Sequence, residues 1–588
     1  MLARPIRPAP PGTSPRWAWA GRVAGIGALV ACVACHPSTT ATADDPQPHQ
    51  DAGETVTAAR PRLVVVVAVD QMPSRIVERY GARWTGGLRR VLDEGVVTLD
   101  GWHRHAGTFT AAGHATLATG RDPREHGFVA NRWWDRDAWT EVDVVADPEV
   151  KPVGVEDGRP LSPVHLLTEG LADWFEAADP RAHTVGVGLK DRAVIGLSGR
   201  HPDLAVWLDR NTGRWVTSTW YADALPPFVA RAEVARRARE LLGDGWTVLR
   251  GDPDEPVPDR VLAEADRVHV TFPHRTKDLL AWDGTVEAAI RATPFGDTLV
   301  ADLAVAAVEQ GSLGRDDVPD LLCVAFSSTD YVGHRFGPDS REIVDTYDRL
   351  DADLARLFDA LDTHVGRDRY VLLLTSDHGV TPLPEHAGGR RILPSELVAD
   401  AERAVAELRR TDEAIARLPQ PRVAYRDGVY FGFDAAVPNE ARAKIRAAAA
   451  EALRRREDVA DVFTWDELSG AAPPKRRFGR AVFRSFHPER SPDLWVVPAK
   501  GSLVIDYPGT THGTPYAWDR QVPIAVVGPG IEPARTALHV ETVLVAPLLA
   551  HLAGVRTPSD LPAATGSTAR AFAGWAAAVS GGLGDGGR

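Results

Sequence analysis

The sequence predicts an α/β fold with a mostly parallel central sheet that is covered by helices on both faces. Nearly unbroken apolar runs recur along the chain, as strands buried on both faces require. Stretches with a helical hydrophobic pattern lie between some of these runs. In such folds, ligands bind beyond the carboxyl ends of the strands.

Five apolar runs are predicted to form the buried strands. They cover residues 62–70, 183–189, 320–326, 370–377 and 522–528. Helical patterns at 297–310 and 342–361 precede and follow the third run. The polar residues that follow these strands in the sequence are therefore the first candidates for a functional site. They are Asp70, Lys190, Arg192, Asp330, His334, Asp377 and His378.

The pattern changes between residues 382 and 505. Helices with broad charged faces are separated there by the strand-like segment GVYFGF, which predicts an inserted, smaller α+β subdomain. The main domain would then comprise residues 61–381 and 506–575. The small-residue segment 576–588 predicts a flexible tail.

The N-terminus is predicted to direct export. Residues 1–31 combine arginines with an apolar stretch too short to span a bilayer, as in a signal peptide. The sequence LVA before Cys32 resembles a bacterial lipoprotein signal, so we expect lipid attachment at Cys32 and a periplasmic or cell-surface location. Plain secretion after cleavage nearby is the alternative. The polar segment 32–60 is predicted to be a disordered tether.

Charge and cysteine content exclude several classes of function. A net charge of −13 offers no general attraction for polyanions, so we expect no nucleic-acid partner, and any anion site must be small and specific. Contact with a membrane is expected only through the N-terminal anchor. Three cysteines cannot build a disulfide framework, and a thiolate metal site is not expected.

Two short motifs carry residues of the types that bind metals. Asp330 and His334 in STDYVGH stand one helical turn apart, so a helix would bring both side chains to the same side. Asp377 and His378 are adjacent, and they can converge on one ion in the tight loop that Gly379 permits. Each pair could therefore share a metal ion.

Asp70 and His512 complete a set of three carboxylates and three imidazoles without thiolates. Such a set suits Zn²⁺ at sites that stay open for catalysis, although other divalent metals bind the same ligands. Each residue alone also has a structural interpretation, and Thr110 could cap the helix AAGHATLATG. Their joint occurrence next to strands favours a metal site beside a hydroxyl group.

The ordered motifs VDQM, TFTAAGHATLATGRDPREHGFVANRWWD, LKDR, STDYVGHRFGP, SDHG and THGT closely resemble the alkaline phosphatase superfamily. The resemblance is to the branch with a threonine nucleophile and a lysine/arginine pair, which is related to the type I phosphodiesterase/nucleotide pyrophosphatases. It spans residues 62 to about 530, and every matching position holds the expected residue type. It implies two Zn²⁺ ions, one bound by Asp330, His334 and His512, the other by Asp70, Asp377, His378 and the Thr110 oxygen.

The resemblance further implies hydrolysis of small-molecule phosphate monoesters through a covalent phosphothreonine at Thr110, with release of inorganic phosphate. Asn131, Lys190 and Arg192 would contact the phosphate oxygens. A monoester carries more charge on the transferred group than a diester, so the lysine/arginine pair favours a monoesterase. A phosphodiesterase/nucleotide pyrophosphatase of the same superfamily is the alternative.

Three further classes of protein fit the sequence less well. A sulfatase would need a C-x-P-x-R or S-x-P-x-R motif at the nucleophile, and TFTAAGH does not match it. Cofactor-independent phosphoglycerate mutases use a serine and other ligand spacings. A non-catalytic binding protein on a phosphatase scaffold would have lost the nucleophile or a ligand, and this sequence keeps them all.

Overall fold

The computed structural model describes residues 60–251, 257, 259–264, 267–564 and 566–579. The predicted signal peptide (1–31), Cys32 and the tether up to residue 59 lie outside the described residues, as do residues 580–588. Helix α22 (Gly566–Val579) continues through residues 576–579, which the sequence had placed in a flexible tail. None of the described helices combines the length and the apolar composition needed to cross a bilayer.

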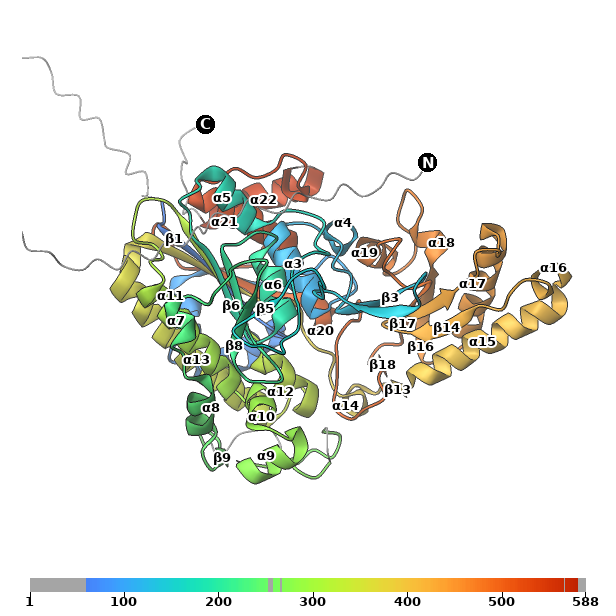
Figure 1. The fold of residues 1–588 in the computed structure, drawn as a ribbon, viewed down its shortest axis with the longest axis horizontal. Helices are drawn as coiled ribbons and strands as arrows, with labels where there is room; N and C mark the ends of the chain where they lie inside the picture. The colour runs from blue at the N-terminus through green and yellow to red at the C-terminus, as the bar shows by residue number, and fades with distance from the viewer. Residues whose placement is uncertain (1–59, 252–256, 258, 265–266, 565, 580–588) are drawn as a thin grey trace, which may run out of the picture. The chain divides into compact units, whose positions relative to one another are not determined.

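A large mixed sheet forms the centre of the main domain, in the order β20-β2-β19-β12-β1-β11-β6-β7-β8-β5 with β21 beside β2 (Figure 1). Strands β12, β1, β11, β6 and β7 run parallel to one another, whereas β19 is antiparallel to both of its neighbours. The strands are β1 (Leu63–Val69), β2 (Val96–Trp102), β5 (Pro152–Val153), β6 (Thr184–Gly188), β7 (Leu204–Leu208), β8 (Trp215–Ser218), β11 (Asp320–Phe326), β12 (Tyr370–Thr375), β19 (Gln521–Val527), β20 (Ala534–Thr536) and β21 (Val540–Glu541). The five strands predicted from apolar runs are confirmed as β1, β6, β11, β12 and β19.

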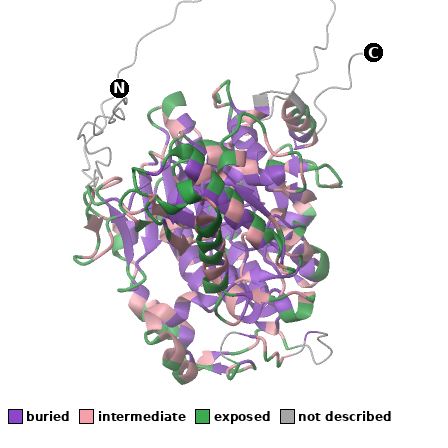
Figure 2. Ribbon diagram, turned by 90° about the vertical axis from the view of Figure 1, so that its right-hand side faces the viewer, coloured by how far each residue is buried: buried purple, intermediate pink, exposed green. Residues whose placement is uncertain are grey.

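Helices cover both faces of this sheet, as predicted. Side chains of β1 alternate between two cores: Leu63 and Val65 pack in the core with α2 (Gly87–Glu94), α11 (Phe295–Gln310) and α13 (Arg341–Leu361). Val64 and Val66 pack in the core with α5 (Leu171–Ala178), α21 (Val545–Ala553) and α22. Both sides of the strands are thus removed from water, and Figure 2 shows the sheet as a largely buried layer. Burial on both faces is the reason for the unbroken apolar runs.

The remaining elements of the main domain are short. The helices are α1 (Ser74–Tyr80), α3 (Thr110–Thr119), α4 (Pro123–His126), α6 (Asp191–Ser198), α7 (Pro227–Ala230), α8 (Val234–Leu242), α9 (Thr276–Asp283), α10 (Val286–Arg291), α12 (Ser328–Phe336) and α20 (Ala517–Arg520). Two antiparallel strand pairs lie outside the large sheet: β3 (Arg132–Asp135) with β4 (Thr140–Asp143), and β9 (Gly245–Trp246) with β10 (His274–Arg275).

The segment predicted as an inserted subdomain carries a second, antiparallel sheet in the order β14-β15-β17-β16. Its residues pack with α15 (Pro394–Thr411) and α17 (Asn439–Arg454) around a separate core that includes Leu397, Ile445 and Phe431. The elements are α14 (Pro384–Ala387), β13 (Arg391–Ile392), α15 (Pro394–Thr411), α16 (Glu413–Ala416), β14 (Arg422–Tyr425), β15 (Val429–Gly432), α17 (Asn439–Arg454), β16 (Val459–Thr464), α18 (Trp465–Leu468), α19 (Gly479–Ser485), β17 (Leu494–Pro498) and β18 (Leu503–Val504). The boundaries at residues 382 and 505 stay a prediction.

The strand order decides where polar residues meet. Strands β12, β1, β11 and β6 are consecutive neighbours, and their last residues are in register: Ala68 pairs with Thr375, Val69 with Phe326, and Ala325 with Gly188. Because these parallel strands end at one edge, the residues that follow them lie together there.

Candidate active site

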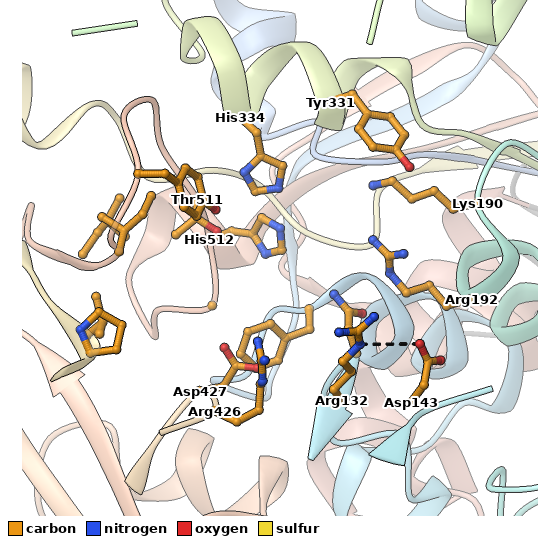
Figure 3. A pocket seen from close by; sticks show the side chains of 18 of the residues that line it. Arg132, Asp143, Lys190, Arg192, Tyr331, His334, Arg426, Asp427, Thr511 and His512 are labelled. Atoms are coloured by element: carbon orange, nitrogen blue, oxygen red, sulfur yellow. Dashed lines mark ion pairs between the residues drawn. The ribbon is translucent and has the colours of Figure 1, made fainter. Parts of the chain in front are cut away.

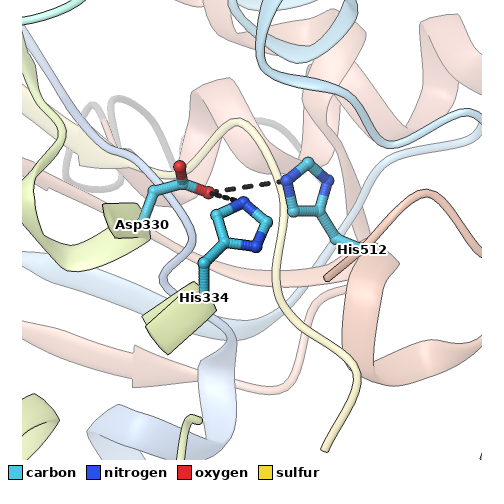
Figure 4. Close-up of side chains that lie close together, drawn as sticks. All are labelled: Asp330, His334 and His512. Carbon is cyan, nitrogen blue, oxygen red and sulfur yellow. Dashed lines mark ion pairs between the residues drawn. The ribbon is translucent and has the colours of Figure 1, made fainter. Parts of the chain in front are cut away.

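An aspartate and two histidines converge beside the ends of the strands (Figure 4). Helix α12 follows β11 directly and brings Asp330 and His334 to the same side, with His334 Nε2 3.1 Å from Asp330 Oδ1. His512 reaches the same oxygen from a distant segment, with its Nε2 at 3.4 Å. The three side chains therefore form one group that could hold a metal ion.

A second group of potential ligands shares Asp330 and adds Asp70 and His378. His378 Nε2 lies 3.4 Å from Asp70 Oδ1 and 3.2 Å from Asp377 Oδ2, and all of these side chains are buried. The structure thus brings together all six Asp and His residues that the sequence predicted as ligands.

The three histidines are oriented alike. Each Nδ1 donates a hydrogen bond to a backbone carbonyl oxygen, which leaves Nε2 directed at the carboxylates. The acceptors are Thr510 for His334 (2.7 Å), Thr108 for His512 (2.6 Å) and Gly379 for His378 (2.9 Å). Metal-binding histidines are commonly held in this way, by a second hydrogen bond outside the metal site.

Several buried ligand atoms are unsatisfied within the described structure. Asp70 Oδ1, Asp377 Oδ2 and His378 Nε2 have no hydrogen-bond partner there. Burial, together with the negative charges of Asp330 and Asp377, raises the pKa of Asp70 to about 8. A cluster of buried carboxylates needs compensating cations, and oxygen and imidazole ligands without thiolates fit divalent metal ions.

Thr110 is the first residue of α3 and is 1% exposed. The predicted alternative in which Thr110 caps this helix is wrong, because the N-cap residue is Phe109 and no side-chain cap hydrogen bond forms. The hydroxyl group therefore lies at the helix N-terminus, where free backbone N–H groups and the helix dipole favour an anion.

Helix α3 contacts the loop after β12 very closely. A Cβ atom at Gly113 would lie 2.1 Å from the backbone oxygen of Asp377, so only glycine allows this approach. His114 joins the two segments, with Nδ1 2.9 Å from the Thr110 carbonyl oxygen and 3.1 Å from Asp377 Oδ2. His114 is not among the predicted site residues, although it stands one helical turn after Thr110 in the motif TFTAAGHATLATG.

Gly379 has a different role from the predicted one. Its φ is not in the left-handed region, so the loop does not need glycine for its backbone conformation. A Cβ atom there would instead lie 2.1 Å from the backbone oxygen of Trp518. Close packing of two loops is the reason for glycine at this position.

Lys190 is 3% exposed at the end of the loop after β6. Its ammonium group donates to Asp70 Oδ2 at 2.7 Å and to Asp330 Oδ2. It also lies 4.8 Å from the centre of the Tyr331 ring. The alternative of an ordinary surface-charge cluster is therefore wrong for Lys190, which is buried among potential metal ligands.

Gln71 is a second residue that the sequence analysis missed. Its side-chain amide donates to Asp330 Oδ1 at 2.7 Å, and its backbone N–H donates to Asp377 Oδ1 at 3.2 Å. It follows Asp70 in the motif VDQM, but no periodic pattern distinguishes it from a loop residue. Gln71 thus helps to fix two of the carboxylates.

A cavity of about 580 Å³ opens over this cluster (Figure 3). Of the predicted site residues, Asn131, Lys190, Arg192, His334 and His512 line it, whereas Thr110 and the other carboxylate and imidazole groups are buried more deeply. Asn131 Oδ1 accepts a hydrogen bond from the backbone N–H of Ala111 at 3.0 Å, which fixes it beside the start of α3. The arrangement places two cations and two of the potential metal ligands around one opening, while the Thr110 hydroxyl group is buried more deeply.

Comparisons with known proteins agree with this geometry. The family described as "Type I phosphodiesterase / nucleotide pyrophosphatase" matches residues 64–521. Alkaline phosphatase PafA of Elizabethkingia meningoseptica is 32% identical over 528 residues, which cover 86% of this chain and 94% of PafA. Alkaline phosphatase PhoK of Sphingomonas sp is 32% identical over 522 residues, covering 86% and 90% of the two chains.

The solved structure of wild-type PafA superimposes with a TM-score of 0.77 at 30% identity, covering 86% of this chain and 98% of that one. A PafA variant with substitutions at one threonine, one asparagine, one lysine and one arginine gives the same TM-score at 29% identity. Fold and sequence are thus those of the alkaline phosphatase superfamily. Within it, the chain belongs to the type I phosphodiesterase/nucleotide pyrophosphatase family.

Proposed function

We propose that the protein hydrolyses phosphate monoesters through a covalent phosphothreonine on Thr110 and releases inorganic phosphate. The observation that carries the proposal is the position of Thr110 at the N-terminus of α3, the helix that packs against the loop carrying Asp377. The similarity to alkaline phosphatases over most of the chain supports a monoester substrate.

We further propose that two divalent metal ions, zinc in the first instance, are bound at this cluster. Asp330, His334 and His512 would hold one ion, and Asp70, Asp377, His378 and the Thr110 oxygen the other. When bound, such ions act as Lewis acids on phosphate oxygens and lower the pKa of a coordinated hydroxyl group.

The residues around the site would have separate roles in the reaction. The Thr110 oxygen forms a bond to phosphorus as the bond to the leaving alcohol breaks, and water later cleaves the phosphothreonine. Backbone N–H groups at the start of α3 and Asn131 orient the phosphate. Arg192 binds its non-bridging oxygens by a planar fork.

Lys190 can contribute without leaving its carboxylate partners. An ammonium group has three N–H donors, and two of them serve Asp70 and Asp330. The third donor remains for a phosphate oxygen. The substituted PafA variant supports the roles of Thr110, Asn131, Lys190 and Arg192. Its substituted threonine, asparagine, lysine and arginine follow in the same order along the chain. The threonine–asparagine spacing and the lysine–arginine spacing are also the same in both proteins.

A phosphodiesterase activity is the second candidate, and the matching family carries that name. The basic pair distinguishes the two functions, since it favours the more highly charged monoester group. Small-molecule phosphate esters, rather than nucleic acid, are the expected substrates in either case.

Removal of bound metal should abolish hydrolysis of an aryl phosphate, and zinc should restore it. The reason is that the buried carboxylates and imidazoles are proposed to act as metal ligands, so without the ions they cannot support hydrolysis. Metal content and activity would be measured on the same samples. Metal-free protein that keeps its activity would exclude the mechanism.

Histidine variants provide a matched comparison for the metal site. His512→Ala should lower both zinc content and activity, since its imidazole belongs to the ligand group. His539→Ala should change neither, because His539 is exposed, lies outside the ligand group and pairs with Asp100 at 3.2 Å. Equal effects of the two substitutions would contradict the assignment.

The anchor belongs to the proposal as well: the protein would be exported and tethered by lipid on Cys32. Cys32→Ala should move the enzyme from the membrane fraction to the soluble periplasmic or extracellular fraction and leave its activity intact. Fractionation and mass spectrometry of the mature N-terminus would check this. A mature protein that starts elsewhere and carries no lipid would contradict it.

A further inference from the structure

One wall of the cavity comes from the second sheet rather than from the sheet that carries the aspartates and histidines. Strands β14 and β15 are joined by a tight turn, and Tyr425, Arg426 and Asp427 of this hairpin line the cavity. In Figure 3, Asp427 lies on the side of His512, across the opening from Lys190. The hairpin is thus placed to contact whatever extends beyond the phosphate group.

The carboxylate of Asp427 lines the cavity as a potential hydrogen-bond acceptor. Within the described part of the chain, its carboxylate has no hydrogen bond and no ion pair. Against the effect of burial, the neighbouring Arg426 lowers the pKa of Asp427 through its charge, but its guanidinium group donates its side-chain hydrogen bonds to Glu141, with Nε at 2.8 Å. Burial raises the pKa of Asp427 to about 6, which agrees with a lack of hydrogen-bond donors.

The backbone of the turn holds Asp427 in place. Its φ is 55°, a left-handed conformation that is unfavourable for most residues but tolerated best by Asn and Asp besides glycine. The next residue, Gly428, has a φ of 148°, and a Cβ atom there would lie 2.4 Å from Pro492 Cγ. The turn is therefore packed against the segment leading into β17, and the carboxylate is fixed beside the cavity.

We propose that Asp427 is a specificity-determining residue that accepts a hydrogen bond from the leaving group of the substrate. This rests on the proposed phosphatase function. The preferred substrates are phosphate monoesters whose alcohol carries a further hydroxyl or ammonium group. A site with a partly buried acceptor discriminates strongly against analogues that lack the donor, because the acceptor then stays unpaired. The cavity is large enough for a leaving group of this kind.

The test compares kcat/KM for matched pairs of substrates in the full-length enzyme. Glycerol phosphate is paired with propyl phosphate for the hydroxyl group, and aminoethyl phosphate with ethyl phosphate for the ammonium group. The wild-type enzyme should prefer the donor-bearing member of at least one pair by on the order of tenfold or more, the scale of a hydrogen bond to a charged group.

Two substitutions are compatible with the left-handed backbone at position 427, and together they distinguish a hydroxyl donor from an ammonium donor on the substrate. Asp427→Gly removes the acceptor, and it should reduce the preference to within about twofold of unity, since only the interaction with the extra donor is lost. Asp427→Asn keeps a neutral acceptor oxygen, so a hydroxyl preference should largely persist while an ammonium preference falls. Asp506→Asn is the control, because Asp506 also lines the cavity but is exposed, so water satisfies its carboxylate with either substrate and both ratios should stay unchanged.

The outcomes separate this inference from the proposed function. Wild-type enzyme that hydrolyses none of the four monoesters would refute the proposed function. Hydrolysis of all four with ratios near one, or equal shifts in the Asp427 and Asp506 variants, would overturn the role of Asp427 and leave the phosphatase activity standing.

Discussion

Replacing Thr110 with alanine should lower kcat/KM for phosphate monoesters by on the order of 10⁴ or more, the scale of losing a covalent nucleophile. The substitution removes the oxygen that would form the phosphothreonine. Residual diester hydrolysis should fall with it, because both substrates would use the same nucleophile. Steady-state kinetics with an aryl phosphate and its methyl diester would measure the two losses.

Thr110→Ser is the matched control for this prediction. Serine keeps a hydroxyl group at the start of α3, so substantial activity should remain. Thermal unfolding should change little in either variant relative to the wild type, since the side chains differ by few atoms. Activity in Thr110→Ala close to that of Thr110→Ser would exclude Thr110 as the nucleophile.

Replacing Arg192 with alanine should lower monoester kcat/KM by on the order of 10² or more, as does loss of one transition-state donor. Arg192 lines the cavity, and its proposed role is to bind charge on the transferred phosphate. A diester carries less of that charge and should lose less activity. Equal fractional losses for the two substrates would mean that Arg192 does not recognise phosphate charge.

Lys190→Ala should also lower monoester hydrolysis more than diester hydrolysis, and it should in addition lower the stability of the protein. Lys190 is an ion-pair partner of both Asp70 and Asp330, so its removal leaves two buried carboxylates with less compensation. Breaking a buried ion pair costs about 3–5 kcal/mol. Thermal unfolding and metal content of Lys190→Ala should therefore be measured together with its kinetics. Arg192→Ala is the cleaner test of phosphate recognition, because no such loss of stability is expected for it.

The sequence predicted the central strands and the metal-type ligands because both follow from local rules. A strand covered on both faces must be apolar throughout, which makes β1 and β11 visible as unbroken runs. Asp330 and His334 are one helical turn apart in the sequence and therefore on one side of α12. The order of parallel strands then brings Asp70 and Asp377 to the same edge.

Features that depend on tertiary contacts could not be predicted in this way. The burial of Lys190 depends on a pairing of β6 with β11 that no local pattern encodes. His114 reads as one more residue of an alanine-rich helix until α3 is placed against the Asp377 loop. Asp427 lies in a hairpin of the second sheet, far in sequence from every motif, and only the folded chain brings it to the cavity.

The most direct test of the central claim is the ratio of kcat/KM for an aryl phosphate to that for its methyl diester in the wild-type enzyme. Both substrates share the leaving group and the proposed nucleophile, so the ratio reports how the site responds to charge on the transferred phosphate. The phosphate monoesterase account predicts a ratio well above one. A ratio at or below one would contradict it and make the phosphodiesterase the better description.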